Sequence, residues 1–174
     1  MLWIAKAGAI LLTGDQPAHL FEIAPVFMAT ALLGLHTLLD GRGGTFTRID
    51  GFATYGCFLL SLASVAVYAQ GAESTSEETF DPLIFMAFLS LVASLILLGA
   101  AYRRTDDALI RWQSLPLVLG VAMPLMMIGG GVLEAVNERL LEVPIVILGL
   151  GWIMLGVALV TAPTSRPLPD GSAL

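Results

Sequence analysis

Five long apolar runs constrain the fold of this chain more than any other feature of its sequence. They cover residues 20–39, 49–69, 82–102, 115–133 and 143–162. Each is close to the roughly 20 residues that an α-helix needs to cross a hydrocarbon core about 30 Å thick. Transmembrane β-strands would alternate apolar and polar side chains at every second position, and these runs do not. The pattern predicts an all-α, polytopic integral membrane protein, built as a bundle of five transmembrane helices.

The composition agrees with a membrane environment. Hydrophobic residues make up 57% of the chain and charged residues 13%, whereas soluble domains have about 45–50% apolar and about 25% charged residues. The connections between the runs are too short to form a separate domain, so residues 1–162 are expected to be a single transmembrane helical domain. Residues 163–174 are rich in Pro, Ser and Gly, which predicts a flexible C-terminal tail.

Residues 1–13 form a shorter apolar segment that contains Lys6. As a helix this segment would reach only about 20 Å, which is too short to cross the membrane unaided. A signal peptide would place its positive charge ahead of the apolar stretch and end in a small-residue cleavage site. An interfacial or half-inserted helix is therefore expected, with a sixth span and a targeting segment as the alternatives.

The basic residues of the connections predict the orientation of the chain. The connection 40–48 carries two arginines, the connection 103–114 carries three, and the tail carries Arg166. Because Lys and Arg collect in cytoplasmic loops, both connections and the C-terminus are expected to be cytoplasmic, with the N-terminal segment outside. Lys6 is the main exception. The expected location is a cell or inner membrane.

The connections on the opposite side are acidic. The connection 70–81 has no Lys or Arg, and the connection 134–142 has one arginine among three glutamates. The net charge of -6 lies largely in these two connections, so no nucleic-acid partner is expected. The expected partners are the lipid bilayer and either other membrane subunits or further copies of the same chain.

The sequence shows no catalytic or cofactor motif. Its single cysteine, Cys57, can form no intramolecular disulfide and no cysteine metal cluster. His19 and His36 would lie about 25 Å apart along one helix, so a haem would need His36 with a methionine or with a partner subunit's histidine. Hydrolase, zinc-protease and nucleotide-binding patterns are missing. No metal or cofactor is expected, and nothing indicates an enzyme.

Six residues of the second run recur at alternating steps of four and three: Asp50, Thr54, Cys57, Ser61, Ser64 and Tyr68. This spacing places all six on one face of a helix. Small and hydroxyl residues at such a spacing let membrane helices approach closely and hydrogen-bond to one another. The six are therefore predicted to form a helix-packing face. The alternative is the polar wall of a permeation path.

The first run carries two ionisable residues, Glu22 and His36. A helix would hold them near one face and about 21 Å apart, close to opposite membrane surfaces. Interfacial water, the helix dipole at Glu22 and a partner for His36 in Asp40 would satisfy both locally. The alternative is a role in proton or ion transfer, because ionisable residues inside a membrane often mark such paths.

The fourth run combines a proline, three consecutive glycines and a glutamate: Pro124, Gly129, Gly130, Gly131 and Glu134. Proline removes a backbone donor, and glycines remove the side chains that hold a helix rigid. The run is therefore predicted to be kinked or broken, as a hinge, with Glu134 at an external acidic vestibule. The alternative is that these residues provide only close packing or a bend.

Two classes of function follow from these features. The leading prediction is a non-catalytic integral membrane protein, an accessory or structural subunit of a larger membrane complex. The alternative is a small transporter or channel with a broken fourth helix and the external vestibule near Glu134. A membrane enzyme or redox subunit comes third.

Overall fold

The computed structural model describes residues 2–13, 20–39, 44–69, 76–104, 112–137, 140 and 142–161. In these residues the secondary structure is helical, with no strand. The α-helices, in chain order, are α1 (Leu2–Thr13), α2 (Leu20–Leu39), α3 (Gly44–Ala69), α4 (Ser76–Tyr102), α5 (Leu115–Glu134) and α6 (Glu142–Val160). The predicted all-α bundle is confirmed. The predicted tail, 163–174, lies outside the described residues.

Four helices contain a stretch long and apolar enough to cross a membrane: Thr47–Val67 in α3, Pro82–Tyr102 in α4, Leu115–Glu134 in α5 and Glu142–Val160 in α6. In α2, the predicted first span, the apolar stretch among the described residues is shorter, Ile23–Leu39. At most 33% of the apolar window in any of the four is buried inside the fold. Apolar surface on this scale needs a lipid environment or partner helices, and the chain is a multi-pass membrane protein.

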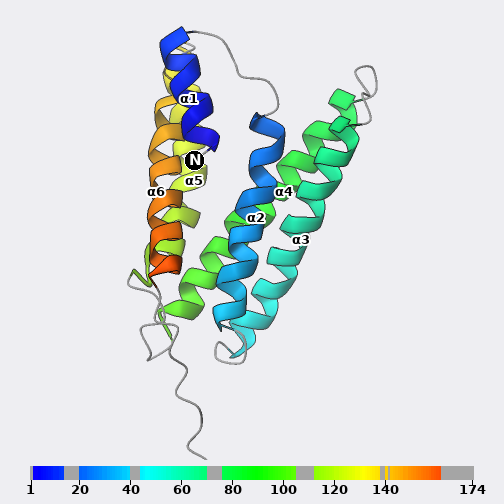
Figure 1. The fold of residues 1–174 in the computed structure, drawn as a ribbon, viewed down its shortest axis with the longest axis vertical. Coiled ribbons are helices and arrows are strands. Elements are labelled where there is room, and N and C mark those ends of the chain that lie inside the picture. Colours follow the sequence, from blue (N-terminus) through cyan, green and yellow to red (C-terminus); the bar gives the residue numbers. More distant parts are fainter. Residues whose placement is uncertain are drawn as a thin grey trace, which may run out of the picture.

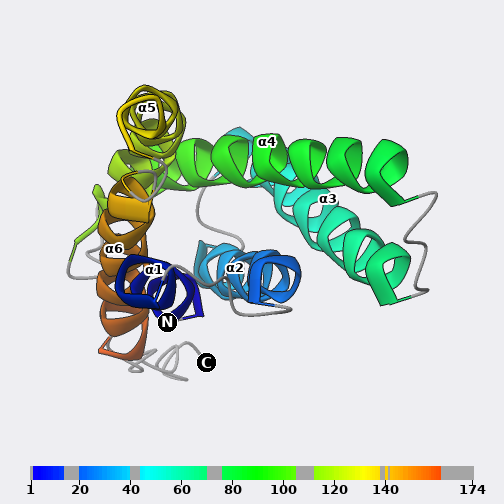
Figure 2. The same cartoon turned by 90° about the horizontal axis from the view of Figure 1, so that it is seen from above.

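Successive helices from α2 to α6 run in opposite directions (Figure 1). The last turns of α2, α4 and α6 therefore lie at the same end of the bundle as the first turns of α3 and α5. The most extensive contact joins α3 to α4, and α4 also packs against α5 and α2. Seen from above, α4 connects the α2–α3 side of the fold to the α5–α6 side (Figure 2).

The apolar core runs through α2, α4, α5 and α6, where α4 packs against α2 and α5, and α5 packs against α6. It contains the fully or almost fully buried side chains Leu32, Leu35, Leu95, Leu98, Leu119, Met123, Leu148 and Leu155. Lipid tails are as apolar as leucine, so the hydrophobic effect does little to bring these helices together. Close packing and interhelical hydrogen bonds must hold them instead.

Two glycines allow the backbones of α4 and α5 to touch. A Cβ atom at Gly99 would overlap the backbone nitrogen of Leu117. A Cβ at Gly120 would lie 2.8 Å from Cγ1 and 3.0 Å from the backbone nitrogen of Ile96. The pair of helices can adopt this spacing only because neither position carries a side chain.

The short helix α1 lies along part of α6 (Figure 1). Ala7 is fully buried, and Ile4 packs directly onto Gly149 of α6. With 12 residues, α1 extends only about 18 Å and is too short to cross a membrane. An interfacial or half-inserted position for this helix stays a prediction.

The predicted break in the fourth run is wrong, because α5 is continuous from Leu115 to Glu134. A kink at Pro124 stays a prediction. The turns of α5 superpose in Figure 2, which looks along this helix. An unpaired backbone group in hydrocarbon costs several kcal/mol, whereas a glycine costs about 1 kcal/mol relative to alanine. The helical hydrogen bonds around Pro124 therefore persist, although the proline itself cannot donate one.

Candidate functional site

A carboxylate is fully buried in the bundle, that of Asp50 in α3. It lies inside the apolar stretch Thr47–Val67. A charged or polar group in such surroundings is costly unless other groups hydrogen-bond to it. The hydrogen-bond partners of Asp50 therefore determine how this carboxylate is stabilised and which chemistry it can take part in.

Side chains from three helices meet at this carboxylate and form the polar cluster of His36, Asp50, Thr54 and Ser94. Nδ1 of His36, in α2, lies 2.7 Å from Oδ2 of Asp50. The Ser94 hydroxyl of α4 donates to Oδ1 at 2.8 Å. The Thr54 hydroxyl, one turn further along α3, donates to the same oxygen at 3.2 Å. Each carboxylate oxygen thus has a partner, and the cluster joins α2, α3 and α4.

The hydroxyl groups of Thr54 and Ser94 also contact one another, at 2.6 Å. Oδ1 of Asp50 and the two hydroxyl oxygens therefore form a triangle of hydrogen-bonding distances. All three members are fully buried. Hydrogen bonds in such a low-dielectric setting are strong and polarise one another, so the triangle fixes how α3 and α4 face each other.

His36 lies in the last turn of α2, where the helix dipole favours a positive charge. Its ring meets the ring of Tyr55 edge to face, with centroids 6.0 Å apart. Gly51 makes room for the imidazole, because a Cβ there would lie 3.3 Å from Cε1 of His36. The His36 side chain keeps 12% of its surface exposed while that of Asp50 keeps 0%. His36 thus stands between the buried carboxylate and the outside.

Beside the cluster, a hydrogen bond joins α4 directly to α2. The fully buried Tyr102 donates its hydroxyl to the backbone carbonyl of Leu35 at 2.9 Å. Leu35 directly precedes His36, so this bond and the contact with Asp50 hold the same turn of α2 from two sides.

Five of the six residues of the predicted packing face are buried with at most 1% exposure: Asp50, Thr54, Cys57, Ser61 and Ser64. The side chain of Tyr68 lies outside the described residues. Asp50 and Thr54 hydrogen-bond to Ser94 of α4. Further along, Ser64 donates to the carbonyl of Ser61 in its own helix at 2.8 Å, and Oγ of Ser61 has no hydrogen-bond partner. Among the five described side chains of this face, those of Asp50 and Thr54 are the ones that hydrogen-bond to another helix.

The sequence pattern predicts Asp40 as the partner of His36 and does not link His36 to Asp50. Asp40 lies outside the described residues, and the structure places Asp50 against His36. The sequence does contain information that favours this pair. When a short connection joins two antiparallel helices, the last turn of the first helix lies beside the early turns of the second helix. Residues 36 and 50 are therefore expected at similar depths in the membrane.

The other candidate residues lie away from the polar cluster. Glu22 is in the first turn of α2, with its side chain outside the described residues, and Glu134 is exposed at the end of α5. Pro124 and Gly129 are partly buried, whereas Gly131 is exposed. The remaining glycine of the three, Gly130, is buried. The structure therefore does not bring these residues together with His36.

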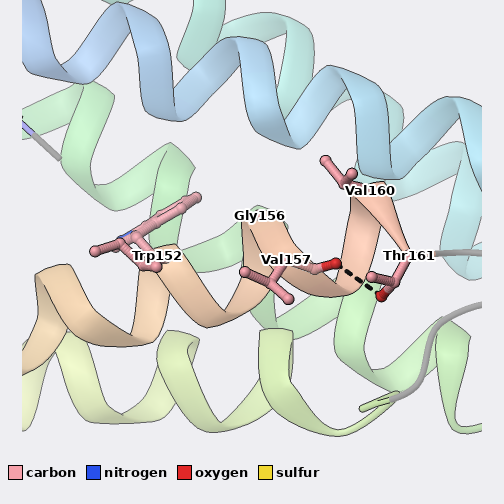
Figure 3. Close-up of a pocket in the computed structure, with 6 residues that line it drawn as sticks. Trp152, Gly156, Val157, Val160 and Thr161 are labelled. Atoms are coloured by element: carbon pink, nitrogen blue, oxygen red, sulfur yellow. Dashed lines mark hydrogen bonds between the residues drawn. The ribbon is translucent and has the colours of Figure 1, made fainter.

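A pocket of about 430 Å³ lies along the second half of α6. Its lining is almost wholly apolar and comes from Trp152, Ile153, Gly156, Val157, Val160 and Thr161. Figure 3 shows the Thr161 hydroxyl turned back onto the carbonyl of Val157, at 2.8 Å. The indole Nε1 of Trp152 is buried without a hydrogen-bond partner. An apolar hollow on a membrane helix is a natural place for a lipid chain.

Comparison of the chain with models of protein families, with curated proteins and with solved structures finds no match. The chemistry of the site is therefore read from its residues. Within the described part of the chain, no three His, Cys, Asp or Glu side chains gather where they could hold a metal ion. A carboxylate, an imidazole and two hydroxyls in contact can hold protons and pass them between one another.

Proposed function

We propose that the chain is a non-catalytic membrane protein that acts as an accessory or structural subunit of a larger membrane complex. This proposal rests on the contrast between the buried polar groups of the bundle and the exposed surfaces of its helices. Inside, both oxygens of the buried Asp50 carboxylate are hydrogen-bonded within the fold. Outside, at most 33% of any of the four spanning windows is buried. Most of each helix is thus available to lipid or to another subunit.

The surface of α5 supports a partner helix in particular. Large apolar side chains are exposed along it at helical spacing: Val118, Val121, Leu125, Ile128 and Val132. Two glycines lie beside them, and a Cβ at Gly129 or Gly131 would meet nothing within 4 Å. Glycines on an open helix face let a neighbouring helix approach closely. We propose that α5 is where a second membrane subunit packs.

Crosslinking in the native membrane tests this proposal. Gly129→Cys in a Cys57→Ser background places a thiol on the open face of α5, and Gly56→Cys provides a matched glycine position on α3 that also meets nothing within 4 Å. The proposal predicts a crosslink from residue 129 to a different polypeptide, and none from residue 56. A chain that purifies alone in mild detergent and crosslinks to nothing from residue 129 would contradict it.

A small transporter or channel is the second candidate function. The continuous helix α5 removes the break on which it was first based. The observation that now favours it is the contact between His36 and Asp50 at 2.7 Å, because paired ionisable residues inside membranes commonly mark substrate or proton paths. Flux across vesicles containing the purified chain, compared with vesicles containing Asp50→Asn, distinguishes this function from a structural one.

A further inference from the structure

We propose that His36 and Asp50 form a proton-binding site inside the membrane-spanning part of the fold, and that the partly exposed His36 side chain is its entrance. The proposal uses only the geometry of the polar cluster. It holds whether the chain works alone or as a subunit of a complex, and it is tested separately from the proposed function.

The distances in the polar cluster are those of direct hydrogen bonds. Nδ1 of His36 lies 2.7 Å from Oδ2 of Asp50, and the two hydroxyl oxygens lie 2.6 Å apart. Contacts this short let a proton move from one group to the next, so the ligand that fits this geometry is a proton.

The triangle of oxygens accommodates Asp50 in both its protonation states. Each hydroxyl carries one proton, so with an ionised carboxylate two protons serve three oxygen contacts, and one of the protons is shared. A proton on Oδ2 leaves these three contacts as they are, and the carboxyl then donates that proton to Nδ1 of His36, 2.7 Å away. A site that satisfies its groups in both states can take up a proton and release it without unpacking.

The charges around Asp50 leave His36 as its main electrostatic partner. Nδ1 of His36 reaches it from α2, and the Ser94 hydroxyl reaches it from α4. Tyr102, also in α4, donates its hydroxyl to the Leu35 carbonyl. The described arginines at this end of the bundle are exposed: Arg48, Arg103 and Arg104. Among the described residues, His36 is thus the basic side chain that contacts the carboxylate.

The route of the proton follows from the difference in exposure. Asp50 has no exposed side-chain surface, whereas His36 retains 12%. A proton that binds Nε2 of His36 can be matched by transfer of the Nδ1 proton to Oδ2 of Asp50. The imidazole begins and ends neutral, with its proton moved from Nδ1 to Nε2, and the carboxylate becomes a carboxylic acid. One proton enters, and no further reactant is needed.

A hydrophobic carbodiimide tests the site in the folded chain. Such reagents react with protonated carboxyl groups that lie in apolar surroundings, and mass spectrometry locates the adduct. The proposal predicts an adduct at Asp50 in the full-length chain in lipid vesicles, and none at the exposed Glu134. An Asp50 that stays unmodified in the folded chain would overturn the proposal.

The entrance is tested in the same assay. Diethyl pyrocarbonate modifies accessible imidazole nitrogens, and a His19→Gln background leaves His36 as the remaining histidine. Treated protein should form the Asp50 adduct at least about tenfold more slowly, since a positioned proton donor contributes this much or more. The variant His36→Gln should show the same slowing if circular dichroism shows it folded. An unchanged rate after treatment would rule out His36 as the route.

Discussion

His36 and Asp50 are neighbours across the α2–α3 contact, with Nδ1 of the imidazole 2.7 Å from Oδ2 of a carboxylate that has no exposed surface. Removing the imidazole leaves a buried carboxylate oxygen without its hydrogen-bond partner, at a cost of about 1–3 kcal/mol or more. His36→Leu should therefore lower stability in detergent by about this amount. Replacing both residues by leucine should cost clearly less than the sum of the two single changes. A double-mutant cycle of thermal unfolding measures the difference, and additive single changes would show that the pair does not interact.

The approach of α4 to α5 at Gly99 gives a second prediction. Because a Cβ at this position would overlap the Leu117 backbone, Gly99→Ala must push the helices apart and should destabilise the chain by about 1–3 kcal/mol. Gly56→Ala is the control, since its Cβ would meet nothing within 4 Å, and it should be neutral or stabilising. Equal melting temperatures for the two variants would mean that α4 and α5 are not in this contact.

Apolar run length predicted the spans, but helix ends extend beyond it. The second run begins at residue 49, whereas α3 begins at Gly44; the third begins at residue 82, whereas α4 begins at Ser76. Hydropathy marks the part of a helix that matches the hydrocarbon, and a helix can continue into the polar interface with charged residues in its first turns.

The contact at the candidate site and the continuity of α5 were harder to predict, for different reasons. Periodicity places Asp50, Thr54 and Ser61 on one face of a helix, but it does not say which residue of another helix faces them. Ser94 and His36 enter the site only through the crossing of α4 and α2 with α3. No break forms at Pro124, because the unpaired backbone groups that a break would leave in lipid cost more than keeping the proline and the glycines inside a helix.

The middle of the α3 face gives a third prediction. Ser61 is fully buried, so Ser61→Leu must force a larger side chain into a close helix contact and should cost about 1–3 kcal/mol. Ala66 is exposed on the same helix, and Ala66→Leu should leave unfolding in detergent almost unchanged. If the two variants melt alike, Ser61 faces lipid and not a helix.

Orientation in the membrane can be measured at the two ends of α4. One cysteine replaces Ser76, the first residue of α4, and another replaces Thr105, three residues after the last residue of α4, each in a Cys57→Ser background. The arginine-rich connections predict that residue 105 is cytoplasmic and residue 76 external. An impermeant maleimide added outside intact cells should label the cysteine at 76 and spare the one at 105. The reverse pattern would invert the proposed orientation, and equal labelling would exclude a span between the two sites.

The proline and glycines of α5 give the last prediction. Since the helix is continuous through them, Pro124→Ala should restore a backbone hydrogen bond and raise stability, by part of the roughly 3 kcal/mol that an interior proline costs. Gly129→Ala should also stabilise, because its Cβ meets nothing within 4 Å, whereas a Cβ at Gly120 would lie 2.8 Å from Ile96 and should destabilise. Thermal unfolding of the three variants separates helix propensity from close packing. A Pro124→Ala chain that unfolds more easily than the wild type would show instead that the bundle depends on a bend at the proline.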